Sequence, residues 1–152
     1  MKASTHVGIS AVAAISAYKL TGSQPMSISL FLSGIFIDLD HVLDFILLSK
    51  ERFSISNFFS WCNDLRWQKA FIVFHSYELI TIFALMSFLL ANDILIGITI
   101  GCVLHLLADQ ISIMTLERTE GVSPWLYFFS YRYSVGFEKK GYFSKRVEPS
   151  LH

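Results

Sequence analysis

Four long hydrophobic segments constrain this chain more than any other feature of its sequence. They lie at about residues 5–20, 26–48, 70–91 and 94–114. The second, third and fourth have the roughly 20 residues that an α-helix needs to cross a bilayer. Backbone in lipid must satisfy its hydrogen bonds within the segment, so such stretches fold as helices. We therefore predict an all-α, polytopic membrane protein built on a bundle of four transmembrane helices.

The first segment is short and rich in small residues, which raises the alternative of a cleaved signal peptide. Lys2 precedes it, and the stretch AISA near its end loosely resembles a cleavage site. Against this alternative, His6 stands at the start of the segment and Lys19 lies just beyond the AISA stretch. We expect an uncleaved first helix.

Basic residues outside the segments indicate how the chain is oriented. Those that follow the second or the fourth segment are Lys50, Arg52, Arg66, Lys69, Arg118, Arg132, Lys139, Lys140, Lys145 and Arg146. The turn at residues 92–93 contains no basic residue. Because cytoplasmic loops carry the excess of Lys and Arg, we place both termini and the 49–69 connection in the cytoplasm.

Two aromatic stretches, at residues 49–69 and 124–133, mix Phe, Tyr and Trp with charged residues. Aromatic rings with polar edges settle at the headgroup level, so we expect amphipathic segments at the membrane interface. Alternatively, both stretches also frame the entrance to a site. The predicted organisation is a transmembrane bundle over residues 1–115, including the cytoplasmic connection, followed by an aromatic and basic tail over residues 116–152.

The composition limits the classes of partner that we expect this chain to bind. Only 16% of the 152 residues are charged and the net charge is zero, whereas soluble domains carry about 25% charged residues. No basic stripe is present, so we predict no nucleic-acid partner and expect membrane lipid instead. Cys62 and Cys102 lie in different surroundings without CxxC spacing, and they predict neither a disulfide nor a thiolate metal site.

Ionisable residues interrupt the second segment. The stretch GIFIDLDHVLDFILLS, residues 34–49, contains Asp38, Asp40, His41 and Asp44. An Asp at the centre of a spanning helix costs about 2.5–3.5 kcal/mol, so three cost about 7–10 kcal/mol, while the apolar residues return roughly 4–9 kcal/mol. The segment is near break-even, so we expect its carboxylates to be neutralised by a proton, a cationic partner or a metal.

The other segments carry ionisable residues at helical spacing. His6 opens the first segment, His75 and Glu78 are three residues apart in the third, and His105 and Asp109 are four apart in the fourth. Residues three or four apart are neighbours on a helix. In the predicted orientation these groups and the acidic face of the second segment lie in the cytoplasmic half, so the bundle should bring them to one level.

Small residues mark a helix contact on the same face of the fourth segment. Gly97 and Gly101 precede His105 and Asp109 in steps of four residues. Glycine lets a neighbouring helix approach closely, so we expect this stripe to face another helix.

Imidazoles and carboxylates without a thiolate suit zinc, manganese or iron, and zinc is the first choice. Bundle cores commonly hold metals through residues on facing helices, and this set suffices for one or two ions. The predicted metal ligands are His6, Asp40, His41, His75, His105 and Asp109. The predicted catalytic residues, which would handle the proton, are Asp38 and Glu78. Two adjacent metals can activate water and stabilise the leaving oxygen of a phosphoester.

Other readings stay open for single residues. His6 can be a hydrogen-bonding contact between helices, Glu78 and Asp38 can cap a helix, and Asp44 can simply reach water. The whole set can also be a proton or ion relay without a metal.

Short motifs occur in a fixed order along the chain: Thr5-His6, Asp38-Leu39-Asp40-His41, His75-Ser76, Gly101 through His105 to Asp109 (G-x-x-x-H-L-x-x-D), and Gly121-Val122. Over residues 6–133 the sequence resembles the membrane-bound, metal-dependent hydrolases of the YdjM type. The resemblance implies a multi-pass protein of the bacterial inner (plasma) membrane. The ligands that it implies are Asp38, Asp40, His41, His75, His105 and Asp109.

The chain departs from that family at one position. The family has a further histidine five residues before the position of His75, where this chain has Ala70. The departure bears on whether a second metal binds and whether the site is catalytically complete. The H-x-x-x-D pattern is also similar to that of zinc-dependent phospholipases C, which favours phosphoesters. The expected function is metal-dependent hydrolysis of a lipid or membrane-associated ester, most plausibly a phosphoester, at the cytoplasmic leaflet.

Two functions of other classes compete with this one. An ion or proton transporter would need polar groups across the whole membrane, and the outward stretches 81–91 and 94–100 are nearly free of them. A non-catalytic membrane regulator would keep the metal as a structural element, which the departure at Ala70 makes reasonable.

Overall fold

The computed structural model describes residues 3–64, 66–115 and 122–143, and this part of the chain is mostly helical. Its long helices are α1 (Ala3–Thr21), α2 (Gln24–Phe36), α5 (Tyr77–Leu90) and α6 (Asp93–Thr115). The shorter elements are α3 (Leu39–Leu48), α4 (Ile55–Asn63), η2 (Pro124–Tyr127), α7 (Phe129–Ser134) and η3 (Lys139–Gly141). Within these ranges the only β-pairing consists of isolated bridges, so the all-α prediction is confirmed. Arg118, Gly121, Lys145 and Arg146, which entered the predictions, lie outside the described residues.

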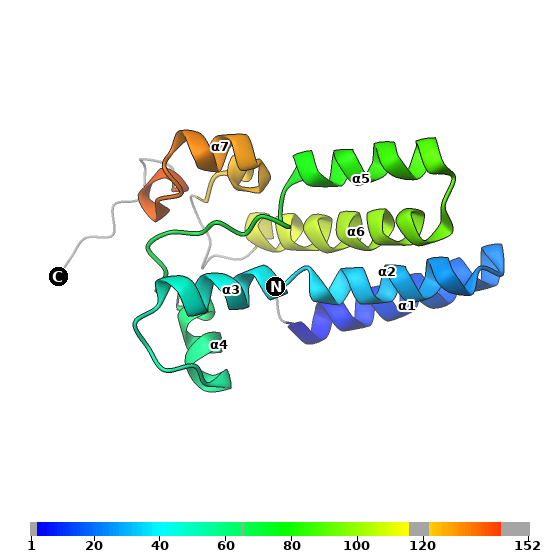
Figure 1. Cartoon of the computed structure of the whole chain (residues 1–152). Helices are drawn as coiled ribbons and strands as arrows, with labels where there is room; N and C mark the ends of the chain where they lie inside the picture. The colour runs from blue at the N-terminus through cyan, green and yellow to red at the C-terminus, as the bar shows by residue number, and fades with distance from the viewer. Residues whose placement is uncertain (1–2, 65, 116–121, 144–152) are drawn as a thin grey trace.

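The four long helices run side by side, with α6 packed against both α2 and α5 and with α1 packed against α2 (Figure 1). The α1–α2 and α5–α6 turns lie at one end of this bundle. At the other end α3 leads away from α2, and α4 and α7 gather there with it. The short elements therefore surround one end of the bundle only.

The closest helix contact in the bundle joins α2 and α6 and depends on glycine. A Cβ atom added to Gly97 would collide with the backbone of Met26, and one added to Gly101 would lie 2.5 Å from the carbonyl oxygen of Leu30. The prediction that this glycine stripe faces another helix is confirmed.

The second hydrophobic segment is two helices and not one, which corrects the sequence expectation. The i→i+4 ladder is interrupted where Asp38 N donates to Ile35 O at 3.4 Å and His41 N donates to Asp38 O at 3.1 Å. Asp38 precedes α3 as its N-cap residue, but its side chain makes no capping bond. The Asp38 carboxylate is thereby free to meet the histidines of other elements.

The third hydrophobic segment becomes helical only at Tyr77, although a helix was expected from residue 70. Ser76 caps α5 by accepting a hydrogen bond from Leu79 N at 3.1 Å. Residues 70–76, called here the His75 loop, are held by side chains instead of by a helical ladder. His75 and Glu78 consequently do not form the pair of helical neighbours that their spacing predicted.

Among the described residues, α6 is the one helix whose length and apolarity suit a membrane crossing by itself. Its neighbour α5 is apolar but shorter, with 14 residues.

Both aromatic stretches fold onto the end of the bundle that carries α3. Phe45 of α3 makes edge contacts with Phe53, Phe58 and Trp61. Residues 122–143, called here the C-terminal segment, form a small core with the His75 loop in which Tyr142 is fully buried. The described part of the tail thus packs against the rest of the fold.

Candidate metal centre

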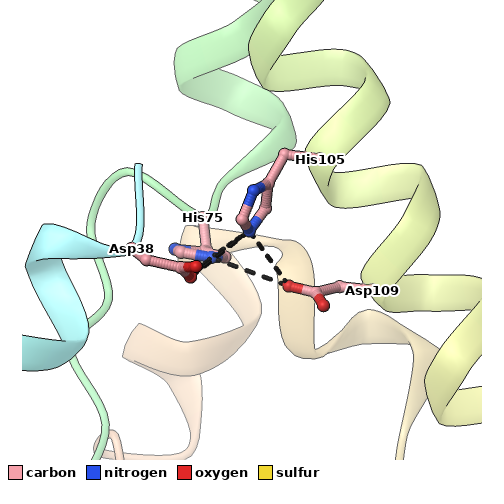
Figure 2. Close-up of side chains that lie close together, drawn as sticks. All are labelled: Asp38, His75, His105 and Asp109. Atoms are coloured by element: carbon pink, nitrogen blue, oxygen red, sulfur yellow. Dashed lines mark hydrogen bonds and ion pairs between the residues drawn. The ribbon is translucent and has the colours of Figure 1, made fainter. Parts of the chain in front are cut away.

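Four side chains from three parts of the fold converge at the α3 end of the bundle, as Figure 2 shows. Asp38 comes from the α2–α3 junction, His75 from the His75 loop, and His105 and Asp109 from α6. One ligand atom from each lies within 4.8 Å of all the others. We refer to these four residues as the candidate metal centre.

Each histidine of the centre is turned by a hydrogen bond on the far side of its ring. His105 Nδ1 lies 2.8 Å from the carbonyl oxygen of Gly34, which can only accept, so this nitrogen carries the proton. His75 Nδ1 lies 3.0 Å from the Asp40 carboxylate, which fixes the same tautomer. The Nε2 lone pairs of both rings are therefore left for the centre.

The two Nε2 atoms face each other at 3.3 Å. When both rings are neutral and protonated on Nδ1, neither Nε2 has a proton to share, and the contact brings two lone pairs together. Asp38 Oδ1 lies 3.3 Å from His105 Nε2 and 3.5 Å from His75 Nε2. Asp109 Oδ2 lies 3.3 Å and 3.8 Å from the same nitrogens. With neutral rings these four acceptors repel one another unless a proton or a metal cation lies between them.

The spacing around His105 Nε2 is that of neighbouring donors in a tetrahedral metal site, and the distances from His75 Nε2 to the two carboxylates are somewhat longer. Zinc binds histidine nitrogen and carboxylate oxygen at about 2.0–2.1 Å, which places neighbouring donors of a tetrahedron about 3.3 Å apart. The distances from His105 Nε2 to His75, Asp38 and Asp109 are all 3.3 Å. The donor set therefore fits a divalent transition metal by chemistry and by spacing.

His6 lies behind Asp109. Its Nε2 is 3.0 Å from Asp109 Oδ1, and its ring stacks on His105 with the centroids 3.9 Å apart. The structure thus gives one oxygen of Asp109 to His6 and turns the other toward the centre. His6 was predicted as a ligand, and its position fits the alternative of a contact between helices that orients a ligand.

Asp38 and Asp40 lie on opposite sides of the His75 ring, near Nε2 and Nδ1 respectively. Asp38, predicted to handle a proton, lies in the candidate metal centre with its side chain 36% exposed. Asp40, predicted as a ligand, is buried behind His75 and also accepts a hydrogen bond from Phe74 N at 2.9 Å. Asp38 lies in the break between α2 and α3, whereas Asp40 lies in the first turn of α3.

His41 lies at the rim of the site. Its Nε2 is 3.8 Å from Asp38 Oδ1, and its side chain is about one-third exposed. It also forms a second possible group with Asp40 and His75. That group shares its histidine with the candidate metal centre, where His75 Nδ1 is already bound to Asp40.

Asp44 and Glu78, the two remaining carboxylates of the hydrophobic segments, accept hydrogen bonds from backbone N–H groups. Asp44, for which contact with water was an open reading, is buried and accepts hydrogen bonds from Phe71 N and Ile72 N at 2.7 and 3.2 Å. Glu78, predicted as catalytic, accepts from Phe129 N and Ser130 N at 2.9 Å each, at the start of α7. These contacts do not test a catalytic role for Glu78, which stays a prediction.

Sequence reasoning missed two groups that orient the histidines. One is the carbonyl of Gly34, which no side-chain pattern can reveal. The other is Arg132, which is fully buried and donates to the carbonyl oxygen of His75 at 2.9 Å. A lone basic residue inside the aromatic stretch YFFSYRY was the available signal, and it was read only as a cytoplasmic charge.

Neither cysteine belongs to the centre. Both are free thiols, and burial raises the pKa of Cys62 to about 12, so its thiol stays protonated near neutral pH. The position of the missing family histidine, Ala70, is buried among Ile72, Leu126 and Tyr142 in the core of the C-terminal segment.

The comparisons with known proteins give no relative: no family model matches the chain, and neither a curated protein nor a solved structure does.

Proposed function

We propose that this chain is a membrane-embedded hydrolase that binds a divalent transition metal, zinc in the first place, in the candidate metal centre. The observation that carries the proposal is the 3.3 Å approach of His75 Nε2 to His105 Nε2, with carboxylate oxygens of Asp38 and Asp109 around them. Two neutral imidazoles and two carboxylates exactly offset a charge of +2, so the set is suited to such an ion.

The charges around the candidate metal centre also favour a bound cation. Asp40, Asp44 and Asp109 are buried and Asp38 is partly so, whereas Arg132 supplies one buried positive charge nearby. Buried charges are costly unless they are paired, so this excess of carboxylates favours a bound cation. A divalent ion brings the balance close to neutrality.

The exposure of the four side chains separates those that would hold the metal from the one that would take part in the reaction. His75, His105 and Asp109 are almost completely buried, whereas Asp38 is open on one side. A metal bound here supplies Lewis acidity toward an ester and lowers the pKa of water. The three buried residues would hold it, and Asp38, on the open side, would take the proton from the attacking water, as the sequence predicted for it.

The apolar surface of the helix bundle supports a location in the membrane. Large apolar side chains point outward from all four long helices, among them Val12, Ile28, Leu85, Phe88 and Ile100. A water-soluble bundle would place polar residues on these faces. In the proposed arrangement the bundle is embedded in the bilayer, with α6 crossing it and the shorter α2 and α5 packed along α6. The basic connections place the α3 end of the bundle at the cytoplasmic leaflet of a bacterial inner membrane.

The choice of a lipid substrate is supported by an apolar cavity of about 290 Å³ between α2, α5 and α6. Its lining includes Ile37, Leu39, Phe74 and Cys102, each a near neighbour in sequence of a residue of the candidate metal centre. An apolar chain in this cavity would leave the polar end of a lipid beside Asp38. The resemblance to YdjM-type hydrolases and to phospholipases C favours a phosphoester.

The proposal is tested with protein purified in mild detergent, by metal analysis and by hydrolysis of bis(p-nitrophenyl) phosphate and of phospholipid in mixed micelles. The wild type and a His152→Ala control should contain about one transition metal per chain and release product. His105→Ala should lose both. A folded wild type without metal, or with metal but no hydrolysis of any tested ester, would contradict the proposed enzyme.

A second candidate, a membrane regulator with a structural metal, is favoured by the number of protein donors. Four protein ligands make a closed site, whereas catalytic zinc usually has three and an open position. Asp38→Asn separates the two functions. In an enzyme it should abolish turnover while metal and fold persist, and in a regulator it should weaken metal binding and lower the thermal midpoint.

A further inference from the structure

The His75 loop has a conformation that its own sequence does not favour. It is irregular from residue 70 to residue 76, and Ile72 lies at φ 30°, on the left-handed side of the backbone map. A positive φ is a genuine outlier for a β-branched residue. Such a conformation persists only when surrounding groups hold it, so the contacts of the loop decide where His75 points.

One side of the loop is held by carboxylates of α3. Asp44 binds Phe71 N and Ile72 N, and Asp40 binds Phe74 N together with the His75 ring. These bonds engage the N–H groups of the loop. They leave the carbonyl groups of Ala70 and His75, at the two ends of the loop, to a different partner.

The other side of the loop is held by the C-terminal segment. Tyr142 Oη donates to Ala70 O at 3.1 Å, and Ala70 N donates to Phe137 O at 3.1 Å. At the far end of the loop, Arg132 Nη1 donates to His75 O at 2.9 Å and to Leu126 O at 3.2 Å. Arg132 therefore joins the C-terminal segment to the backbone of His75 itself.

The burial of Arg132 argues that it has a specific role. Its side chain is completely buried, and Nε and Nη2 have no hydrogen-bond partner among the described residues. A buried guanidinium with so few bonds is costly, and an apolar side chain of similar volume would often be neutral or stabilising there. Across the loop lie Asp40 and Asp44, whose negative charges attract it.

We propose that Arg132 is a positioning residue of the candidate metal centre: it fixes the carbonyl of His75, so that the ring bound by Asp40 presents Nε2 to the metal. The inference rests on the proposed metal binding but not on the substrate. The C-terminal segment then helps to set the geometry of the centre, although none of its described residues is a candidate ligand.

The test compares Arg132→Met with Arg66→Met, the same substitution at an exposed arginine paired with Glu51. Zinc affinity is measured by competition with a chelating dye, and the geometry of the site by the visible spectrum of the cobalt-loaded protein. Arg132→Met should weaken zinc about tenfold or more and change the cobalt spectrum, with helix content by circular dichroism unchanged. Arg66→Met should match the wild type, and Arg132→Lys should restore part of the affinity.

A double-mutant cycle with His75→Ala shows whether Arg132 acts through His75. If it does, Arg132→Met should have little further effect on zinc affinity once the imidazole is gone. An undiminished effect in that background, or normal affinity and an unchanged cobalt spectrum in Arg132→Met, would overturn the inference. A wild type that binds no zinc would instead remove the proposed function, and this inference with it.

If the Arg132 variants do not fold, amide hydrogen exchange on the wild-type protein tests the role of Arg132 instead. Linkage is reciprocal, so metal binding must stabilise the docking of the C-terminal segment if that docking positions His75. The amides of Ala70 and Lys139, which donate across this contact to Phe137 O and Gln68 O, should exchange more slowly with zinc. Protection confined to the α6 residues of the centre would overturn the inference.

Discussion

At the scale of single residues, the orientation of each imidazole is set by the group bound to its Nδ1. His105 is bound by a carbonyl oxygen and His75 by a carboxylate. Partners of this kind fix the tautomer and make the other nitrogen a better ligand. In the proposed metal site Asp40 would contribute without touching the metal, and its charge matters because it faces His75 Nδ1.

Asp40→Asn tests this role. The amide can still accept one hydrogen bond but lacks the charge that favours a protonated Nδ1, so zinc affinity should fall by about 10–100-fold. Affinity is measured by dye competition in detergent. Asp64→Asn, at an exposed carboxylate bound to Ser60, is the matched control and should bind zinc normally. Equal affinities in the two variants would contradict the account.

At the scale of elements, α2 and α6 must touch for the centre to form. Gly34 on α2 offers its carbonyl to His105 on α6, and Gly101 lets the two backbones meet. A Cβ on Gly101 would lie 3.0 Å from Gly34 N as well as close to Leu30 O. The same contact therefore supports both the helix pair and the histidine.

Gly101→Ala should separate the two helices and lower the free energy of unfolding by about 1–3 kcal/mol, the usual cost of overpacking. Zinc affinity should fall too, since Gly34 O moves away from His105. Gly8→Ala is the control, because a Cβ there meets nothing within 4 Å. Thermal unfolding in detergent and dye competition report the two effects. A Gly101→Ala protein as stable as Gly8→Ala would show that the helices do not pack as described.

Glu78 gives a second prediction at this scale. Its carboxylate binds the first N–H groups of α7, so Glu78→Gln should weaken the docking of that helix by about 1–2 kcal/mol. Limited proteolysis or hydrogen exchange at α7 should show the loss while metal content stays normal. If hydrolysis disappears although α7 remains protected, Glu78 is catalytic, as its sequence position suggested.

At the scale of the whole molecule, the sequence predicted the helices and the meeting of acids with imidazoles, because hydrophobic segments and i, i+4 spacing are local properties. His75, His105 and Asp109 lie together as expected. The break between α2 and α3 at Asp38 was not predictable from the hydrophobic pattern, which continues through it. Arg132 and the carbonyl oxygen of Gly34 were not predicted either, because each contacts a histidine that is far away in the sequence.

X-ray absorption at the zinc edge, on wild-type protein purified in mild detergent, tests the central claim most directly. The account predicts nitrogen and oxygen donors at about 2.0–2.1 Å, with scattering from two imidazole rings and no sulfur. Its prediction for His75→Ala is weaker zinc binding, with one imidazole ring fewer around the metal. A metal-free wild type, or a zinc–sulfur distance near 2.3 Å, would contradict it.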